Sequence, residues 1–349
     1  MDRRIIVIFL TVFIDLLGFG ILIPILPTFA QNELMMSETL IGLNIGIFSL
    51  MQFIFNPLWG RLSDIYGRKP ILIFGLAGNV VSYIITGLVL AGVWKSVLLL
   101  FVSRALAGFF SANIGAAMAY ISDVTPPKDR SKGMGLIGAA FGLGFVFGPF
   151  IGGVLAKHYG FGFPTFMSAG LSMIALLLTF FFVNESLPKE LRGAKTMGGF
   201  NVKNGLNKLV SALKHPHVGF LILLYFVIVF SISNIFSTFQ LYAESKDGFS
   251  YDFEQVSYLF AFSGLVGAIT QGVLIRPILR MFDERKVFIA GCIIMGIGLG
   301  TIPFSNHILV LLLGSILFMS FGNGLLLSIG LGLISKFSDR DEQGGILGL

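Results

Sequence analysis

Residues 60–69 read Gly-Arg-Leu-Ser-Asp-Ile-Tyr-Gly-Arg-Lys, and they separate two apolar stretches, Thr39–Trp59 and Ile71–Gly92. Each stretch has about the 20 residues that an α-helix needs to cross a lipid bilayer. Glycines allow a tight reversal between two helix ends, and a carboxylate beside guanidinium groups forms a charge cluster that can break and reform. The sequence therefore predicts two membrane-spanning helices joined by a short charged loop.

The composition of the whole chain agrees with that prediction. Of its 349 residues 55% are hydrophobic and 12% charged, and the mean hydropathy is +0.89. Soluble domains carry about 25% charged residues, so a soluble globular protein is excluded. A disordered chain is excluded too, because disorder needs low hydrophobicity and high charge.

Ten stretches have the length and apolar character of membrane spans, and an eleventh begins near Gln343. They are Ile5–Phe29, Thr39–Trp59, Ile71–Gly92, Val97–Ile121, Gly133–Ala156, Pro164–Val183, Val218–Tyr242, Glu254–Ile275, Val287–Phe304 and Ile308–Ser335. The sequence thus predicts an all-α polytopic membrane protein. Because the chain ends inside a hydrophobic stretch, we expect about 50 further residues that complete spans eleven and twelve.

The positive charges predict the orientation. Of the 24 Lys and Arg residues, 20 fall in the N-terminus and in every second connection, whereas the other connections hold only Lys95, Lys157 and Lys246. The positive-inside rule then places the N-terminus in the cytoplasm, and we expect the protein in the inner cell membrane. Topology explains the net charge of +6, so nothing in the sequence favours a nucleic-acid partner.

The spans form two halves around a polar segment. Residues 1–183 are predicted to form an N-terminal six-helix bundle, 184–217 a basic cytoplasmic linker, and 218–349 an incomplete C-terminal bundle. The order of basic loops in the second half repeats that of the first. We expect a binding site between two such repeats near the bilayer midplane, in a protein that rocks between inward-open and outward-open states.

The segment Gly60–Lys69 resembles the G-x-L-x-D-x-x-G-R-K signature of the major facilitator superfamily at every defined position. The resemblance implies the major facilitator fold of two six-helix bundles. It also implies a gating cluster of Gly60, Asp64, Gly67, Arg68, Lys69 and Asp123, in which Arg68 pairs with Asp123 and Asp64 docks on helix eleven. The alternative is an ordinary basic cytoplasmic loop.

A second motif lies in the fifth span and consists of Gly144, Gly148, Pro149, Gly152 and Gly153. Glycines four residues apart form a smooth helical face that another backbone can approach closely. Pro149 removes an amide and is expected to kink the helix. This pattern resembles the helix-five motif of the antiporter branch of that superfamily, and the alternative is generic small-residue packing.

Asp15 and Arg104 are the ionisable residues deep within the spans. An intramembrane carboxylate is costly unless it is neutralised or paired, so function is the default explanation for Asp15. The stretch around Asp15 resembles helix one of tetracycline and multidrug proton antiporters, and the helix-four arginine is also a family position. We therefore predict that both residues serve proton coupling. The alternatives are a structural carboxylate and an arginine that snorkels to the surface.

Uncharged polar residues within the spans are candidates for lining a substrate cavity, although each alone is also typical of helix–helix contacts. They include Asn44, Gln52, Asn113, Asn234 and Gln240. The single cysteine, Cys292, excludes an intramolecular disulfide, and the four histidines lack ligand spacing, so we expect no metal or cofactor.

The sequence thus predicts a monomeric secondary transporter, and not an enzyme, that resembles the drug–proton antiporters. Its partners would be protons, the lipid bilayer and a small, lipophilic compound that it exports. One alternative is a proton-coupled importer of a sugar or organic acid, against which the helix-five motif argues. A membrane sensor that does not transport is the other alternative.

Overall fold

The computed structural model describes residues 3–125, 130–188, 190, 192, 216–305 and 307–337. Within these residues the chain is helical and contains no strand. Eight helices in the described part are long and apolar enough to span a bilayer, which confirms the all-α polytopic class. Most of the predicted linker and the start of the eleventh span lie outside the described residues.

The chain divides into two compact units. The first comprises Met1–Met197 together with Gln240–Ala261, and the second comprises Gly198–Phe239 together with Phe262–Leu349. The segment Gln240–Ala261 comes from the part of the sequence that we assign to the C-terminal bundle, and it packs within the first unit.

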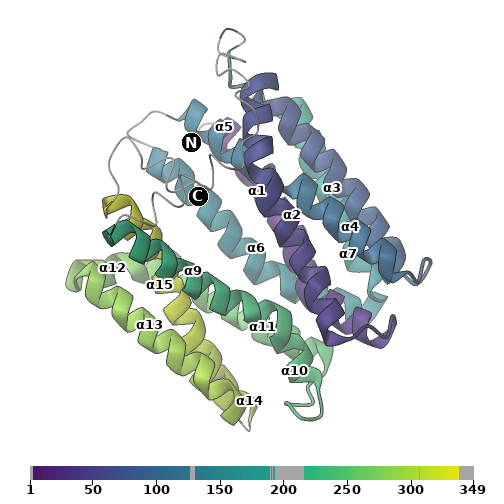
Figure 1. Ribbon diagram of the computed structural model, residues 1–349, viewed down its shortest axis with the longest axis vertical. Coiled ribbons are helices and arrows are strands. Elements are labelled where there is room, and N and C mark those ends of the chain that lie inside the picture. Colours follow the sequence, from purple (N-terminus) through teal and green to yellow (C-terminus); the bar gives the residue numbers. More distant parts are fainter. Residues whose placement is uncertain are drawn as a thin grey trace. The chain divides into compact units, whose positions relative to one another are not determined.

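The helices of the first unit follow the predicted spans closely (Figure 1). They are α1 (Arg3–Asn32), α2 (Glu38–Tyr66), α3 (Arg68–Leu90), α4 (Val97–Ser111), α5 (Ile114–Val124), α6 (Arg130–Tyr159) and α7 (Gly162–Phe182). α1 packs against α6 and α7, while α3 packs against α4 and α7, and α2 against α4.

One local prediction in this unit was wrong. The charged segment after Trp59 is not a loop, because α2 continues through it to Tyr66 and only Gly67 separates α2 from α3. Gly67 has a φ of +106°, a conformation that side chains other than glycine rarely adopt. The predicted span Val97–Ile121 matches one apolar span, Val97–Val124, in which the helix is interrupted at Ala112 and Asn113.

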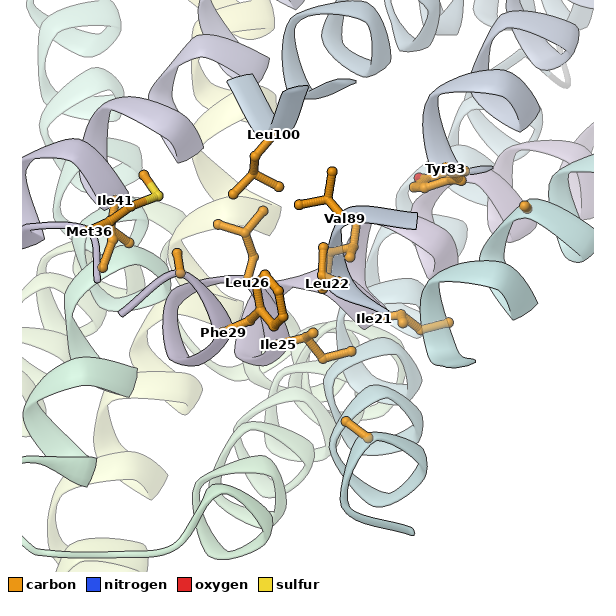
Figure 2. Close-up of a cluster of buried hydrophobic side chains, with 14 of the residues drawn as sticks. Ile21, Leu22, Ile25, Leu26, Phe29, Met36, Ile41, Tyr83, Val89 and Leu100 are labelled. Carbon is orange, nitrogen blue, oxygen red and sulfur yellow. The ribbon is translucent and has the colours of Figure 1, made fainter. Parts of the chain in front are cut away.

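The core at the C-terminal end of α1 is apolar (Figure 2). Ile21, Leu22, Ile25 and Leu26 of α1 recur at helical spacing and are buried there with Leu100 of α4. Pro24 and Pro27 lie within α1, so this turn of the helix lacks two backbone donors. Side-chain packing stabilises the turn instead.

The second unit contains α9 (Pro216–Asn234), α12 (Ile275–Met281), α13 (Glu284–Thr301), α14 (Ile308–Val310) and α15 (Leu317–Phe337). Between Asn234 and Glu244 the helix passes through a π-helical turn, Ile235–Phe239, into α10 (Gln240–Glu244). Further π-helical turns, Thr270–Leu274 and Leu311–Ile316, interrupt the helices after α11 (Phe253–Ile269) and α14. Ile302–Phe304 forms a 3₁₀ turn after α13. The helix α13 packs against α15.

Candidate functional site

Asp15 lies in the middle of α1 and is buried, with 6% of its surface exposed. Its carboxylate accepts a hydrogen bond from the Asn79 amide of α3, at 2.6 Å. The carbonyl oxygen of that amide accepts from the Ser111 hydroxyl at 3.2 Å. A chain of polar groups therefore joins α1, α3 and the end of α4 inside an apolar bundle. Asn79 was not among the predicted site residues, because its pairing with Asp15 depends on how α1 and α3 face each other.

Arg104 of α4 is also buried, with 3% exposed, and therefore does not snorkel to the surface. Its guanidinium carbon lies 4.6 Å from the ring centroid of Phe48 and 5.9 Å from that of Phe19. The two rings stack at 4.7 Å. Among the described residues Arg104 forms no ion pair, and its Nε and Nη1 atoms have no hydrogen-bond partner. Asp15 thus pairs with an amide in this structure, and Arg104 is held by aromatic rings.

Tyr83 of α3 is buried in the same unit and was not among the predicted site residues. Its phenol is within electrostatic range of both Asp15 and Arg104. A β-carbon added at Gly18 would lie 3.0 Å from the Tyr83 hydroxyl oxygen, so the phenol rests directly on α1. No sequence motif marks Tyr83, and only the packing of α3 on α1 brings it to this centre.

The polar residues proposed to line a cavity have different surroundings. Asn44 is fully buried, and neither amide atom has a partner among the described residues. The Gln52 amide donates to the Ser111 carbonyl at 3.3 Å, and the Asn113 side chain is buried against Gly75. Asn234, in the second unit, is exposed, and its amide donates to the Phe230 carbonyl at 2.8 Å.

The charge cluster where α2 ends and α3 begins is centred on Arg68. Its guanidinium contacts Asp64 at 2.6 Å and Asp123 at 3.1 Å, and it donates to the Ser63 hydroxyl at 2.6 Å. The Arg68–Asp123 contact that the resemblance implies is therefore present. Gly60 lies within α2 with open space beside it. The segment onto which Asp64 would dock lies outside the described residues.

Glu185 completes this cluster, although the sequence placed it in the linker. Its carboxylate accepts hydrogen bonds from the backbone amides of Arg68 at 2.9 Å and Lys69 at 3.2 Å. It thereby satisfies two of the free amides at the start of α3 and places a negative charge at a helix N-terminus. A β-carbon at Gly67 would collide with this carboxylate, so Gly67 also makes room for Glu185.

The glycine motif of α6 faces α1. A β-carbon added at Gly148 would lie 2.6 Å from the backbone of Gly20, and one added at Gly144 would lie 2.9 Å from the Leu16 side chain. One added at Gly152 would collide with the Ile21 carbonyl, and Pro149 is buried beside the same contact. Small residues thus bring two helix backbones together along three turns, on the helix that carries Asp15.

Gly153 of the same motif faces elsewhere, because a β-carbon there would collide with the Ser257 hydroxyl of α11. Near this end of the unit, Thr28 donates to both carboxylate oxygens of Glu244 at 3.0 Å. The Gln240 amide donates to the Thr28 hydroxyl at 3.3 Å and also contacts Glu244. Lys157 pairs with Glu254 and, at 3.7 Å, with Asp252. Polar contacts therefore hold the segment Gln240–Ala261 on the first unit.

Long apolar helices, a buried carboxylate and guanidinium, and a charge cluster where two helices meet are the features of a helical membrane transporter. The profile of the Major Facilitator Superfamily matches residues 8–349. The chain therefore belongs to the Major Facilitator Superfamily, which confirms the resemblance seen in the sequence. It is a multi-pass membrane transporter and not an enzyme.

Similar proteins include transporters from bacteria and mammals. Multidrug resistance protein 2 of Bacillus subtilis (strain 168) is 30% identical over 319 residues, which are 90% of this chain and 77% of that protein. The class H tetracycline resistance protein of Pasteurella multocida is 28% identical over 356 residues, covering 100% of this chain and 84% of that one. The crystal structure of the human organic anion transporter MFSD10 matches with a TM-score of 0.74 at 26% identity, over 99% of this chain and 88% of that chain.

Proposed function

We propose that the protein exports a small, lipophilic compound in exchange for protons by alternating access. Relatives named for multidrug and tetracycline resistance support efflux. The backbone contact between α1 and α6 supports the antiporter branch, because it is made by the glycines that the helix-five motif supplies. The protein would act as a monomer in the inner membrane with its N-terminus in the cytoplasm.

The observation that carries proton coupling is the environment of Asp15. Its carboxylate is buried and accepts from one amide, Asn79, and it forms no ion pair with any residue that the structure describes. A carboxylate in the membrane interior is costly unless it is neutralised or paired, and a bound proton neutralises it. The proton acts as a ligand that favours one conformation if the surroundings of Asp15 differ between the inward-open and outward-open states.

Arg104 supplies such a difference in the proposed cycle. It lies in the same bundle as Asp15 and within electrostatic range of Tyr83, which is also within range of Asp15. A conformation that brings the guanidinium toward Asp15 favours the charged carboxylate and releases the proton. The arginine itself stays protonated and carries no proton.

The Arg68 cluster is the proposed conformational gate. Its contacts join α2, α3 and the end of α5 through side chains that reach across helix ends, so they form or break as those ends move. Contacts of this kind bias the balance between two conformations without touching the transported compound. The polar residues Asn44, Gln52 and Asn113 are proposed to lie along the path of the compound in the first unit.

The test is the Asp15→Asn variant, whose amide mimics the neutral carboxyl. It should bind the exported compound as the wild type does, yet lose uphill efflux driven by a pH gradient in everted membrane vesicles. The matched control is Asp247→Asn, which removes an exposed carboxylate from the same unit. Fully pH-coupled efflux by Asp15→Asn would show that the coupling group lies elsewhere. Uptake of the compound into intact cells would show an importer.

A further inference from the structure

Several polar side chains in the described part of the first unit have buried atoms without hydrogen-bond partners, and two of them, Arg104 and Asn44, lie on the packed helices α4 and α2. Arg104 has no partner for Nε and Nη1, and Asn44 has none for either amide atom, among the residues that the structure describes. Arg104 is 3% exposed and Asn44 is fully buried. Buried polar groups are nearly always hydrogen-bonded, and an unpaired buried cation is the costliest exception. Two such exceptions indicate a missing partner.

The two side chains lie at the same level of the α2–α4 interface. α2 and α4 each follow a helix that runs the opposite way, so they are parallel to each other. Their backbones meet where Gly108 faces the Phe48 carbonyl, since a β-carbon at Gly108 would collide with it. Asn44 precedes Phe48 by one helical turn, and Arg104 precedes Gly108 by one turn.

Aromatic rings complete this region. The guanidinium of Arg104 lies over Phe48, and Phe48 stacks on Phe19 of α1. Apolar surface, a fixed cation and an amide thus occur together, with two guanidinium donors and one amide donor free. Asp15, a buried acid of the same unit, accepts from Asn79, and no ion pair joins it to Arg104 in the described structure. The region therefore holds unused hydrogen-bond donors and a positive charge.

We propose that Arg104 and Asn44 form a subsite for the acidic group of the transported compound, which is an aromatic or other lipophilic carboxylate or sulfonate. A free guanidinium nitrogen can donate a charge-assisted hydrogen bond to such a group, and the amide can add another. The aromatic rings accommodate the apolar part of the compound. This inference rests on the proposed export function and names the class of compound that the site selects.

The test compares acids with their neutral amides in equilibrium binding. The purified protein is titrated with radiolabelled benzoate, 1-naphthoate and 1-naphthalenesulfonate, and separately with the three corresponding amides. At least one acid should bind about 10- to 100-fold more tightly than its amide, as expected for buried hydrogen bonds to a charged group. Arg104→Gln should remove this preference, whereas Arg276→Gln, which removes an exposed arginine of the second unit, should keep it.

Asn44→Asp keeps Arg104 and serves as a second variant in case Arg104→Gln fails to fold. The new carboxylate would pair with the guanidinium, so the preference for acids should disappear while the thermal stability rises. Equal binding of all three acids and their amides to the wild type would overturn the proposal, and so would a preference that survives both variants. If an ordered water is the hydrogen-bond partner of Arg104, the wild type should bind the acids and their amides equally.

Equilibrium binding needs no proton gradient, so this test is independent of transport. Acid-selective binding without pH-driven efflux would leave the subsite standing and refute proton exchange. Efflux of neutral or cationic compounds without acid-selective binding would refute the subsite and leave proton exchange standing.

Discussion

Replacement of Glu185 by alanine tests a structural role that the sequence did not reveal. The Glu185 carboxylate accepts from three backbone amides, those of Arg68, Lys69 and Leu187, at 2.9, 3.2 and 3.0 Å. It also lies 3.7 Å from the guanidinium of Arg192. Glu185→Ala removes all four contacts at once and leaves the start of α3 without its acceptor.

The magnitude follows from two effects. Loss of a side-chain acceptor at a helix N-terminus costs about 0.5–2 kcal/mol. Loss of a negative charge at the same place costs about 0.3–1 kcal/mol more, because the helix dipole is no longer opposed. The free energy of unfolding should therefore fall by about 1–3 kcal/mol. Glu185→Gln keeps an acceptor and loses only the charge, so it should show the second effect alone.

The assay is thermal unfolding of the purified protein in detergent, followed by the fluorescence of its two tryptophans. The matched control is Glu190→Ala, which removes an exposed carboxylate from the same segment. We expect the melting temperature to decrease in the order wild type, Glu190→Ala, Glu185→Gln and Glu185→Ala. If Glu185→Ala unfolds together with Glu190→Ala, the carboxylate does not stabilise the start of α3.

Three further substitutions test the helix contact, the gate and the polar contact at Thr28. Gly148→Ala places a methyl group against the Gly20 backbone and should lower the free energy of unfolding by about 1–3 kcal/mol. Gly142 faces open space, so Gly142→Ala should leave the free energy of unfolding unchanged or raise it by up to about 1 kcal/mol. Equal melting temperatures of the two variants would contradict the contact. Asp64→Asn should slow transport several-fold with little change in equilibrium affinity, and equal losses in both would argue against a gating role. Burial raises the pKa of Glu244 above its ordinary value of 4.5, so the folded state binds that proton more readily than the unfolded state does. The protein should therefore lose stability as the pH rises from about 4.5 through the raised pKa. Melting curves of Glu244→Gln should lack this loss, and those of the control Asp247→Asn should retain it.

The sequence predicted the membrane helices of the first unit well, because a helix of about 20 apolar residues has the length needed to cross the hydrocarbon core of a bilayer. It missed the break in the helix that begins at Val97. That break occurs at Asn113, whose side chain is buried against Gly75 of α3. Asparagine competes with helical hydrogen bonds only where a tertiary contact holds its side chain, and such a contact has no local signature. The π-helical turns also lack a sequence signal, because hydrophobic character does not change across them.

The site residues also fall into those that the sequence identified and those that only the structure identified. Asp15, Arg104 and the Arg68 cluster were visible because charged residues within or beside apolar spans are rare. Their partners Asn79, Tyr83 and Glu185 were not, since each pairing depends on how separate helices are rotated toward each other. An ionisable residue can thus be located from the sequence, but its partner is determined by how the helices pack.

Gly67 is the single residue between α2 and α3, so a movement of the end of α2 is transmitted along α3. Gly67 leaves no spare chain length, so any displacement at the end of α2 passes directly to the start of α3. Asn79 stands eleven residues beyond Arg68, about 16 Å along the helix axis. A tilt of about 5° pivoted at Arg68 would move the Asn79 amide by about 1.4 Å, by that same helical rise. This displacement is large enough to part the amide from Asp15, which it now holds at 2.6 Å. The turn between α2 and α3 and the buried carboxyl group of Asp15 are therefore mechanically connected through one helix.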